Sequence, residues 1–260
     1  MRAVVFLVAI SACAQSQQNP SLMVEHTRSH LRQIERHPAG RHEMLSIGTL
    51  FLSGESKNRK TTPLLIHFHG STWLPEQSAH RQNPGAAVLG VQLGSGSAAY
   101  AKPFQEKGRF AELLAEAGKT ANLQFKPIYV SGFSASYGAI REILKEFQPD
   151  GIILIDGLHT GYDPEGKPGP LKSEGLAPFL DYFRQAVSGK RRMLITHSEI
   201  FPGTFASTTE TADFLLERLG IKRMPVVRWG PQGTQQLSVA AKGNFELLGF
   251  AGNSAPDHVD

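Results

Sequence analysis

A serine, two acidic residues and a histidine each follow a short apolar run in this 260-residue chain. A serine hydroxyl is a weak nucleophile at its ordinary pKa, so it needs a histidine within hydrogen-bond reach and a carboxylate that orients the imidazole. The order along the chain is serine, then acid, then histidine. These residue types predict nucleophilic catalysis, and the residues are Ser134, Asp156 or Glu199, and His258.

The stretch IYVSGFSASYGAI at 128–140 offers two serines as the nucleophile. It can be centred on Ser134, as G-F-S-A-S, or on Ser136, as S-A-S-Y-G. With Ser134, Gly132 falls two residues earlier, where a strained turn needs a missing side chain. With Ser136, the strand would extend through Phe133 and leave Gly132 inside it, where glycine weakens pairing. We therefore predict that Ser134 is the nucleophile and that Ser136 is a packing residue.

Two carboxylates compete for the position of the acid. Asp156 directly ends the better-formed apolar run, and Glu199 follows the next run. Aspartate is the commoner acid at such sites, and the neighbours of Asp156 are expected to form a loop facing the site, so we favour Asp156 and keep Glu199 as the alternative. Asp257 is adjacent to His258, so its side chain is expected to point away.

Short apolar runs alternate with helix-length amphipathic segments. Continuous apolar strands alternating with helices predict an α/β class with a mostly parallel central sheet and helices on both faces. In such sheets, ligands bind beyond the carboxyl ends of the strands. The predicted strands are 64–68, 86–93, 128–130, 152–155, 193–195 and 245–250, and the predicted helices are 22–37, 110–123, 139–147, 176–187 and 208–219.

Four motifs in this order resemble those of the α/β-hydrolase superfamily, and the resemblance covers residues 63–258. The motifs are LLIHFHG at 64–70, VSGFSAS at 130–136, ILID at 153–156 and GNSAPDH at 252–258. The resemblance implies the α/β-hydrolase fold, with an oxyanion turn, a nucleophile elbow, an acid and a histidine loop in that order. It also implies backbone N–H donors to the oxyanion, from Ala135 and from Gly70 or Ser71.

The sequence departs from the family pattern in two places. Ser136 stands where the elbow usually has glycine, which leaves a Cβ close to the strand. The family also continues after the histidine into a final helix, whereas this sequence stops at Asp260. We therefore expect that C-terminal helix to be missing.

Length and composition predict a single domain. A chain of this size with 40% hydrophobic residues can bury one sizeable core. We assign that domain to 20–260 and expect a small lid segment at 160–190. The 27 Lys and Arg against 23 Asp and Glu are scattered, which indicates a solvated surface and no nucleic-acid partner.

The first 19 residues predict a signal peptide and a polar linker, because one arginine precedes an apolar run that ends in small residues. Cleavage after Ala14 and lipidation of Cys13 both remain open, and Cys13 is the only cysteine. The protein is thus expected to be exported, as a periplasmic, extracellular or membrane-anchored lipoprotein form.

The expected function is that of a serine hydrolase, by default an esterase acting on a small-molecule ester, with no metal or organic cofactor. Aromatic residues near predicted strand ends are candidates to line the substrate pocket. The run GSGS at 94–97 lacks the lysine of a phosphate-binding loop and is interpreted as a structural turn. The pocket candidates are Trp73, Tyr100, His159 and Tyr162.

Two other classes of function stay open at this point. A metal-dependent hydrolase would use His67 and His69, which alternate on one predicted strand, together with Asp156. A hydrolase fold that has lost its activity and serves as a binding protein is the other alternative. The sequence does not fix the oligomeric state.

Overall fold

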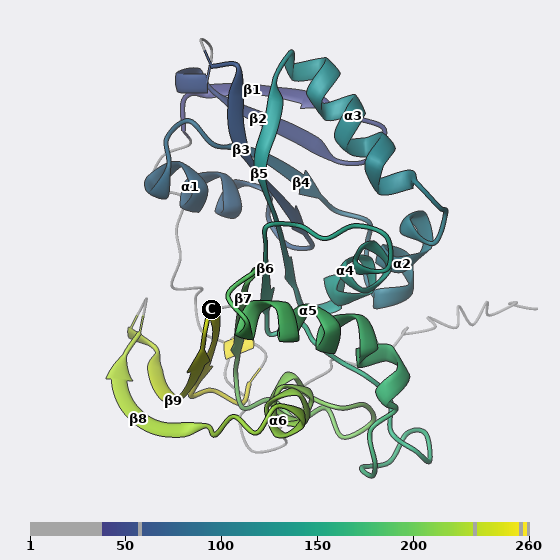
Figure 1. Ribbon diagram of the computed structural model, residues 1–260. Helices are drawn as coiled ribbons and strands as arrows, with labels where there is room; N and C mark the ends of the chain where they lie inside the picture. Colours follow the sequence, from purple (N-terminus) through teal and green to yellow (C-terminus); the bar gives the residue numbers. More distant parts are fainter. Residues whose placement is uncertain (1–37, 57–58, 231–232, 255–256, 259–260) are drawn as a thin grey trace, which may run out of the picture.

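The computed structural model describes residues 38–56, 59–230, 233–254 and 257–258 (Figure 1). The predicted signal peptide and linker at 1–19, with Cys13, and the predicted helix at 22–37 lie outside these residues. Of the helices that are described, none has the length and apolar character needed to cross a membrane.

A ten-stranded mixed sheet forms the centre of the fold, in the order β1-β2-β4-β3-β5-β6-β7-β10-β9-β8. The six middle strands, from β4 to β10 in that order, run parallel. Antiparallel strands extend the sheet on both sides. The strands are β1 (Gly40–Met44), β2 (Thr49–Ser53), β3 (Thr61–Phe68), β4 (Ala87–Val91), β5 (Gln124–Phe133), β6 (Gly151–Ile155), β7 (Arg192–His197), β8 (Met224–Trp229), β9 (Gln235–Lys242) and β10 (Phe245–Phe250).

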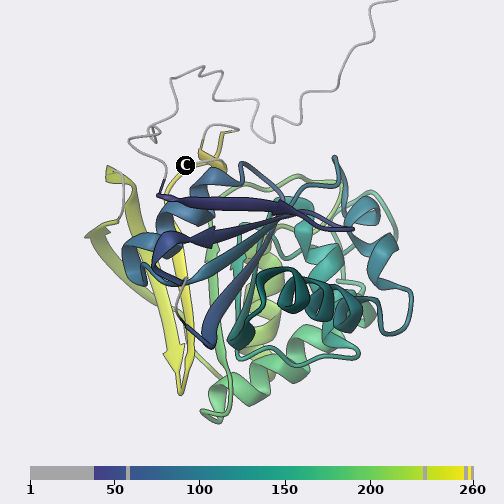
Figure 2. The same ribbon diagram turned by 90° about the horizontal axis from the view of Figure 1, so that it is seen from above.

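Helices cover both faces of the sheet, with α1 on one side and α3 on the other (Figure 2). Helix α1 contacts β3 and β4, α4 contacts β5, and α5 contacts β7 and β10. The predicted α/β class, with a mostly parallel sheet between helices, is confirmed. The helices are α1 (Trp73–Gln82), α2 (Ser97–Phe104), α3 (Arg109–Ala121), α4 (Tyr137–Leu144), α5 (Ala177–Val187) and α6 (Thr208–Arg218).

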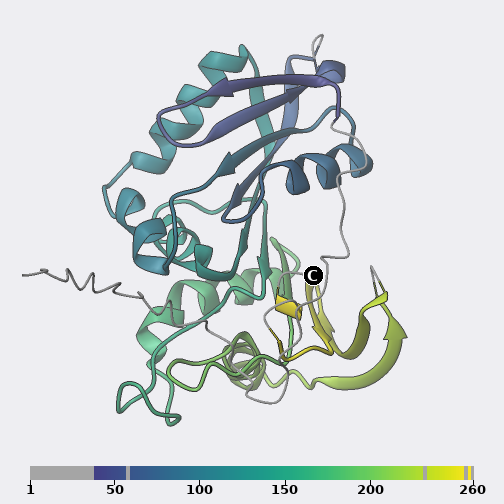
Figure 3. The same ribbon diagram turned by 180° about the vertical axis from the view of Figure 1, so that it is seen from behind.

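The six predicted strands are all present, but four outer strands and two helices were not predicted. Strands β1 and β8 are exposed at most positions, so they show neither a continuous nor an alternating apolar pattern. Helix α2 contains Pro103, a residue that a helix interior normally excludes. At the far edge, the β8–β9 hairpin curves away from the rest of the molecule (Figure 3).

The predicted lid at 160–190 is in fact a loop followed by a core helix. Its first part is closed by bridges that pair Thr160 with Ala206 and Tyr162 with Leu171. Helix α5, which forms the second part, packs against α4 and the sheet and has fully buried aromatic side chains. Only the loop is therefore placed to cover a site.

The elbow between β5 and α4 differs from the expected geometry in one respect. Strand β5 runs through Phe133, so Gly132 lies inside the strand after all. The residue with a left-handed backbone is Ser134, with φ of 48°. A Cβ on Gly132 would collide with the Oγ of Ser136 and lie 2.9 Å from Ile140 Cδ1. Gly132 is thus required by the close approach of Ser136, and not by a turn at Gly132 itself.

Gly132→Ala is expected to lower the free energy of unfolding by about 1–3 kcal/mol, because the added methyl overpacks the contact between β5 and Ser136. Chemical denaturation followed by circular dichroism measures the loss. The double variant Gly132→Ala/Ser136→Gly exchanges the two side chains and should recover part of it. If the double variant is no more stable than the single one, the close approach is not the reason for the glycine.

Candidate active site

The residues predicted to do chemistry lie at the carboxyl ends of three strands. Ser134 follows β5, Asp156 follows β6, and His258 lies beyond β10. Strand β6 is the parallel neighbour of β5, and β7 separates β6 from β10. Because parallel strands end at the same edge of a sheet, the three side chains are carried to one edge.

Asp156 and His258 are joined by a hydrogen bond of 2.7 Å between Oδ2 and Nδ1. An ionised carboxylate only accepts, so the Nδ1 of His258 carries the proton and Nε2 is left with a free lone pair. The Asp156 residue is 7% exposed. Burial alone would raise the pKa of Asp156, but the hydrogen bond and charge of His258 and the hydrogen bond from Ser198 outweigh it and hold this pKa below its ordinary value.

Glu199, the alternative acid, is exposed and its side chain makes no hydrogen bond or ion pair within the described part of the chain. Its backbone N–H donates to the carbonyl of Gly252 at 2.8 Å. The structure therefore brings His258 to Asp156 and leaves Glu199 outside the cluster.

Ser198 is a member of this cluster that the sequence analysis missed. Its hydroxyl donates to Oδ2 of Asp156 at 2.5 Å, the same oxygen that His258 contacts. The carbonyl of Ser198 accepts from Thr209 Oγ1 at 3.1 Å and from His197 Nδ1 at 2.9 Å. Ser198 lies directly after β7, and a polar residue at a strand end was the only signal that could have identified it.

The loop that carries His258 is closed by its neighbour Asp257. Oδ2 of Asp257 accepts from the N–H groups of Asn253 and Ser254, at 3.0 and 2.9 Å, and from Oγ of Ser254 at 2.6 Å. Gly252 has φ of 134°, and a Cβ there would lie 2.5 Å from the Asp257 side chain. Asp257 points away from the site, as expected, and it holds the shape of the loop.

A cavity of about 740 Å³ opens beside Ser134 and Ala135. The ring of His258 lies against Phe133, with ring centres 4.6 Å apart, and Phe133 in turn stacks on His69 at 5.7 Å. His69 is one of the cavity-lining residues. The others, besides Ser134 and Ala135, are Ser95, Gly96, Ser97, Tyr137, His159, Thr160, Gly161 and Phe205.

The turn after β3 is held in an unusual conformation. His69 and Gly70 both have left-handed backbones, with φ of 71° and 94°. The N–H of Gly70 donates to Oε1 of Gln92 at 3.1 Å, so this predicted oxyanion donor already has a partner. Ser71 is exposed, and Ala135 lines the cavity.

Of the four predicted pocket residues, His159 lines the cavity and the other three do not. Tyr100 is fully buried and its hydroxyl contacts His69 Nδ1 at 2.7 Å. Tyr162 is also buried and donates to the carboxylate of Glu210. Trp73 begins helix α1. The rings of Tyr100 and Tyr162 are buried in the fold and their hydroxyls make hydrogen bonds. In contrast, the run at 94–97, which was interpreted as a structural turn only, contributes three lining residues.

His67 and His69 do not act as a pair. His67 is buried, bonds Ser131 Oγ through Nδ1 at 2.7 Å, and has a pKa lowered by burial to about 4. His69 leaves the strand through its left-handed backbone, so the two rings do not continue the alternation expected on one strand. Among the residues that are described, no three His, Cys, Asp or Glu side chains are grouped as a metal site requires.

The mostly parallel sheet with helices on both faces is the arrangement that the resemblance of the four motifs led us to expect. No family model matches the chain, and no curated protein matches it.

Several solved structures are similar to the chain. An esterase 2 from Thermogutta terrifontis, phosphoramylated by tabun, is 12% identical, with a TM-score of 0.49 over 86% of this chain and 88% of that chain. Acetyl xylan esterase from Aspergillus awamori is 13% identical, with a TM-score of 0.45 over 80% and 89%. An acylaminoacyl peptidase from Pyrococcus horikoshii is 14% identical, with a TM-score of 0.44 over 72% of this chain. This chain spans only 36% of the length of that peptidase.

Asp156→Asn is expected to reduce kcat of a reaction that uses His258 as its base by about 10⁴-fold, because an amide no longer selects the Nδ1–H form of His258. Steady-state kinetics with a soluble activated ester measures the effect. Glu199→Gln is the matched control and should change kcat by no more than about twofold, as expected of an exposed side chain. A large loss of kcat in Glu199→Gln, with little change in Asp156→Asn, would make Glu199 the acid.

Ser198→Ala is expected to raise the pKa of Asp156, because loss of a donor makes a carboxylate more basic. A more basic Asp156 takes up a proton at a higher pH, so the acid limb of the kcat/KM profile moves to higher pH. Thr209→Val is the control, since Thr209 bonds the Ser198 carbonyl and not Asp156. An acid limb that stays in place in Ser198→Ala would show that this hydroxyl does not act on the acid.

Proposed function

We propose that the protein is a serine hydrolase that cleaves carboxylic esters through an acyl-enzyme on Ser134. The hydrogen bond between Asp156 and His258, at the strand edge where Ser134 projects in a left-handed turn, is the observation that carries this proposal. The strand-end positions and the cavity beside Ser134 support it.

In the proposed reaction, Oγ of Ser134 attacks the ester carbonyl while Nε2 of His258 takes the hydroxyl proton. His258 then gives this proton to the leaving alcohol, and an acyl-enzyme remains. Water, activated by the same nitrogen, releases the acid. Asp156 keeps the imidazole in the required tautomer and stabilises its charged form.

The oxyanion is proposed to bind the N–H of Ala135, directly after the nucleophile, and one N–H from the turn after β3. Since the N–H of Gly70 donates to Gln92, Ser71 is the better second donor, and Gly70 could serve only by giving up that bond. This choice follows from the hydrogen bonds of the turn, because a donor must be free to meet the developing charge.

The substrate is proposed to be a small-molecule ester with polar groups near its carbonyl. The residues that line the cavity include Ser95, Ser97 and Thr160 as well as the aromatic Tyr137 and Phe205. No cofactor is needed for the proposed steps. Export, with cleavage near Ala14 or a lipid anchor on Cys13, is proposed from the sequence of the first residues.

Labelling with a fluorophosphonate probe tests this function. The wild-type protein and Ser136→Ala are expected to be labelled, because the phosphonate reacts with an activated serine and Ser136 is completely buried. Ser134→Ala should not be labelled, and intact-mass analysis with peptide mapping measures this. Labelling lost in Ser136→Ala but kept in Ser134→Ala would overturn the assignment, and no labelling of the wild type would favour a binding protein or a metal-dependent hydrolase.

A further inference from the structure

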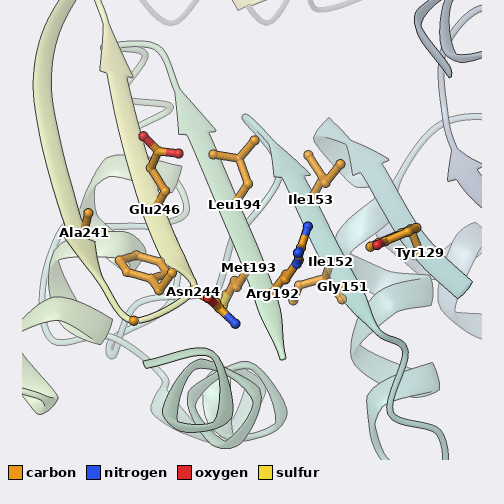
Figure 4. Close-up of a pocket in the computed structure, with 12 residues that line it drawn as sticks. Tyr129, Gly151, Ile152, Ile153, Arg192, Met193, Leu194, Ala241, Asn244 and Glu246 are labelled. Atoms are coloured by element: carbon orange, nitrogen blue, oxygen red, sulfur yellow. The ribbon is translucent and has the colours of Figure 1, made fainter. Parts of the chain in front are cut away.

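A buried polar cluster lies next to the proposed catalytic acid, at the carboxyl end of β7, and the proposed reaction does not use it. Figure 4 shows the opposite end of this strand, where Arg192, Met193 and Leu194 lie beside a cavity of about 550 Å³. None of the residues that line this second cavity is placed in the proposed active site. The cluster, in contrast, is joined to Asp156 through Ser198, so it can act on the acid.

His197, the last residue of β7, is the centre of this cluster and is 5% exposed. Nη1 of Arg223 donates to Nε2 of His197 at 2.6 Å. A guanidinium only donates, so Nε2 must offer a lone pair and the neutral ring must hold its proton on Nδ1. Nδ1 lies 2.9 Å from the carbonyl oxygen of Ser198, which only accepts. The two contacts thus require the same tautomer of His197.

The position of Arg223 is itself fixed by its neighbours. Its Nε donates to Oδ1 of Asp213 on α6 at 2.9 Å, and its Nη1 donates to Oγ of Ser238 on β9 at 3.0 Å. Gly249 on β10 stands between Ser238 and His197 in register. A Cβ on Gly249 would lie 2.9 Å from Nε2 of His197 and collide with Oγ of Ser238, so a side chain there would displace both partners of Nη1.

We propose that His197 is a positioning residue for Asp156 and that Arg223 keeps it in the form that this role needs. The carbonyl of Ser198 accepts from His197, and the hydroxyl of the same serine donates to Asp156. A fixed Ser198 backbone therefore aims this hydroxyl at the carboxylate. The proposal rests on the function proposed above, in which Asp156 orients His258.

The charges around His197 support its neutral form. Burial lowers the pKa of His197 below its ordinary value, and the charge of Arg223 contributes to this shift. The carbonyl of Ser198 and the carboxylates of Asp156 and Asp213 oppose the shift without cancelling it. In the neutral ring only one nitrogen donates. If that nitrogen were Nε2, the lone pair of Nδ1 would face the carbonyl oxygen of Ser198 and repel it.

Two further histidines face the Asp156–His258 pair. His159 interacts with the charges of both members, and His69 interacts with the charge of His258. Burial lowers the pKa of each of these two histidines, so both favour their neutral forms. They are unchanged in the variants of His197 described below, so a shift that separates those variants has its origin at position 197.

NMR of the protein labelled with ¹⁵N-histidine tests the tautomer directly. In the wild type at neutral pH, Nδ1 of His197 is expected to carry the proton and Nε2 to be unprotonated. Arg223→Met removes a charge and a donor at Nε2, so His197 should take up its second proton at a higher pH than in the wild type. Arg184→Met, which removes an exposed arginine of α5 that pairs with Asp181, is the matched control. A proton on Nε2 in the wild type, or an unchanged titration in Arg223→Met, would overturn the proposal.

Two substitutions of similar polarity separate the roles of the two ring nitrogens of His197. Asparagine places an N–H at the position of Nδ1 and can still donate to Ser198, whereas glutamine reaches the position of Nε2 and can contact only Arg223. His197→Gln is expected to move the acid limb of kcat/KM to higher pH, as Ser198→Ala does, but by less, because Thr209 still donates to the Ser198 carbonyl. His197→Asn should leave the acid limb in place. Equal shifts in the two variants, or no shift in either, would contradict the positioning role.

The titration of His258, followed by NMR in a Ser134→Ala background, is a second readout that needs no turnover. It should move to higher pH in His197→Gln and stay in place in His197→Asn. If the wild type hydrolyses no ester but this difference is present, the proposed function fails and the positioning of Asp156 stands. If the wild type hydrolyses esters and the difference is absent, the positioning role alone fails.

Discussion

The hydrogen bond between Asp156 and His258 joins residues 102 positions apart, and the rest of the site depends on it. It can form only if β6 and β10 end at the same edge of one sheet. Strand β7 lies between them, and Ser198 at its end donates to the same carboxylate oxygen. Three strand ends thus converge on one atom, so an error in register at any of them would separate the acid from the histidine.

Backbone strain is concentrated where the chemistry is proposed. Apart from Asn122, the non-glycine residues with left-handed backbones in the described ranges are His69, Ser134 and Asp156, each directly after a parallel strand. Such conformations cost about 1–3 kcal/mol each and persist only when the surrounding structure enforces them. The central sheet holds these residues in place, because most apolar side chains of its parallel strands are buried.

The middle of the fold was predictable because its strands are continuous apolar runs. Ser134 and Asp156 directly follow two of these strands, and His258 lies in the loop beyond β10. Preference for Asp156 over Glu199 rested on the same pattern. The predictions that failed concern single side-chain contacts. The periodicity of a sequence cannot show that the hydroxyl of Tyr100 contacts His69, or that the N–H of Gly70 donates to Gln92. Such contacts join residues from different elements and leave no spacing in the sequence. Ser198 escaped notice because a single serine after a strand is common.

The exposed edge strand β8 bears on how molecules of this protein meet one another. Met224, Val227 and Trp229 are 60%, 81% and 78% exposed, and among the described residues their strand has a neighbouring strand on one side only. An apolar edge strand is a template for sheet continuation between molecules and for aggregation. Pro225 lacks an N–H, and the register shifts between Pro225 and Arg228. These two interruptions oppose such growth, so the edge keeps its apolar surface while its backbone is poorly suited to accept a further strand.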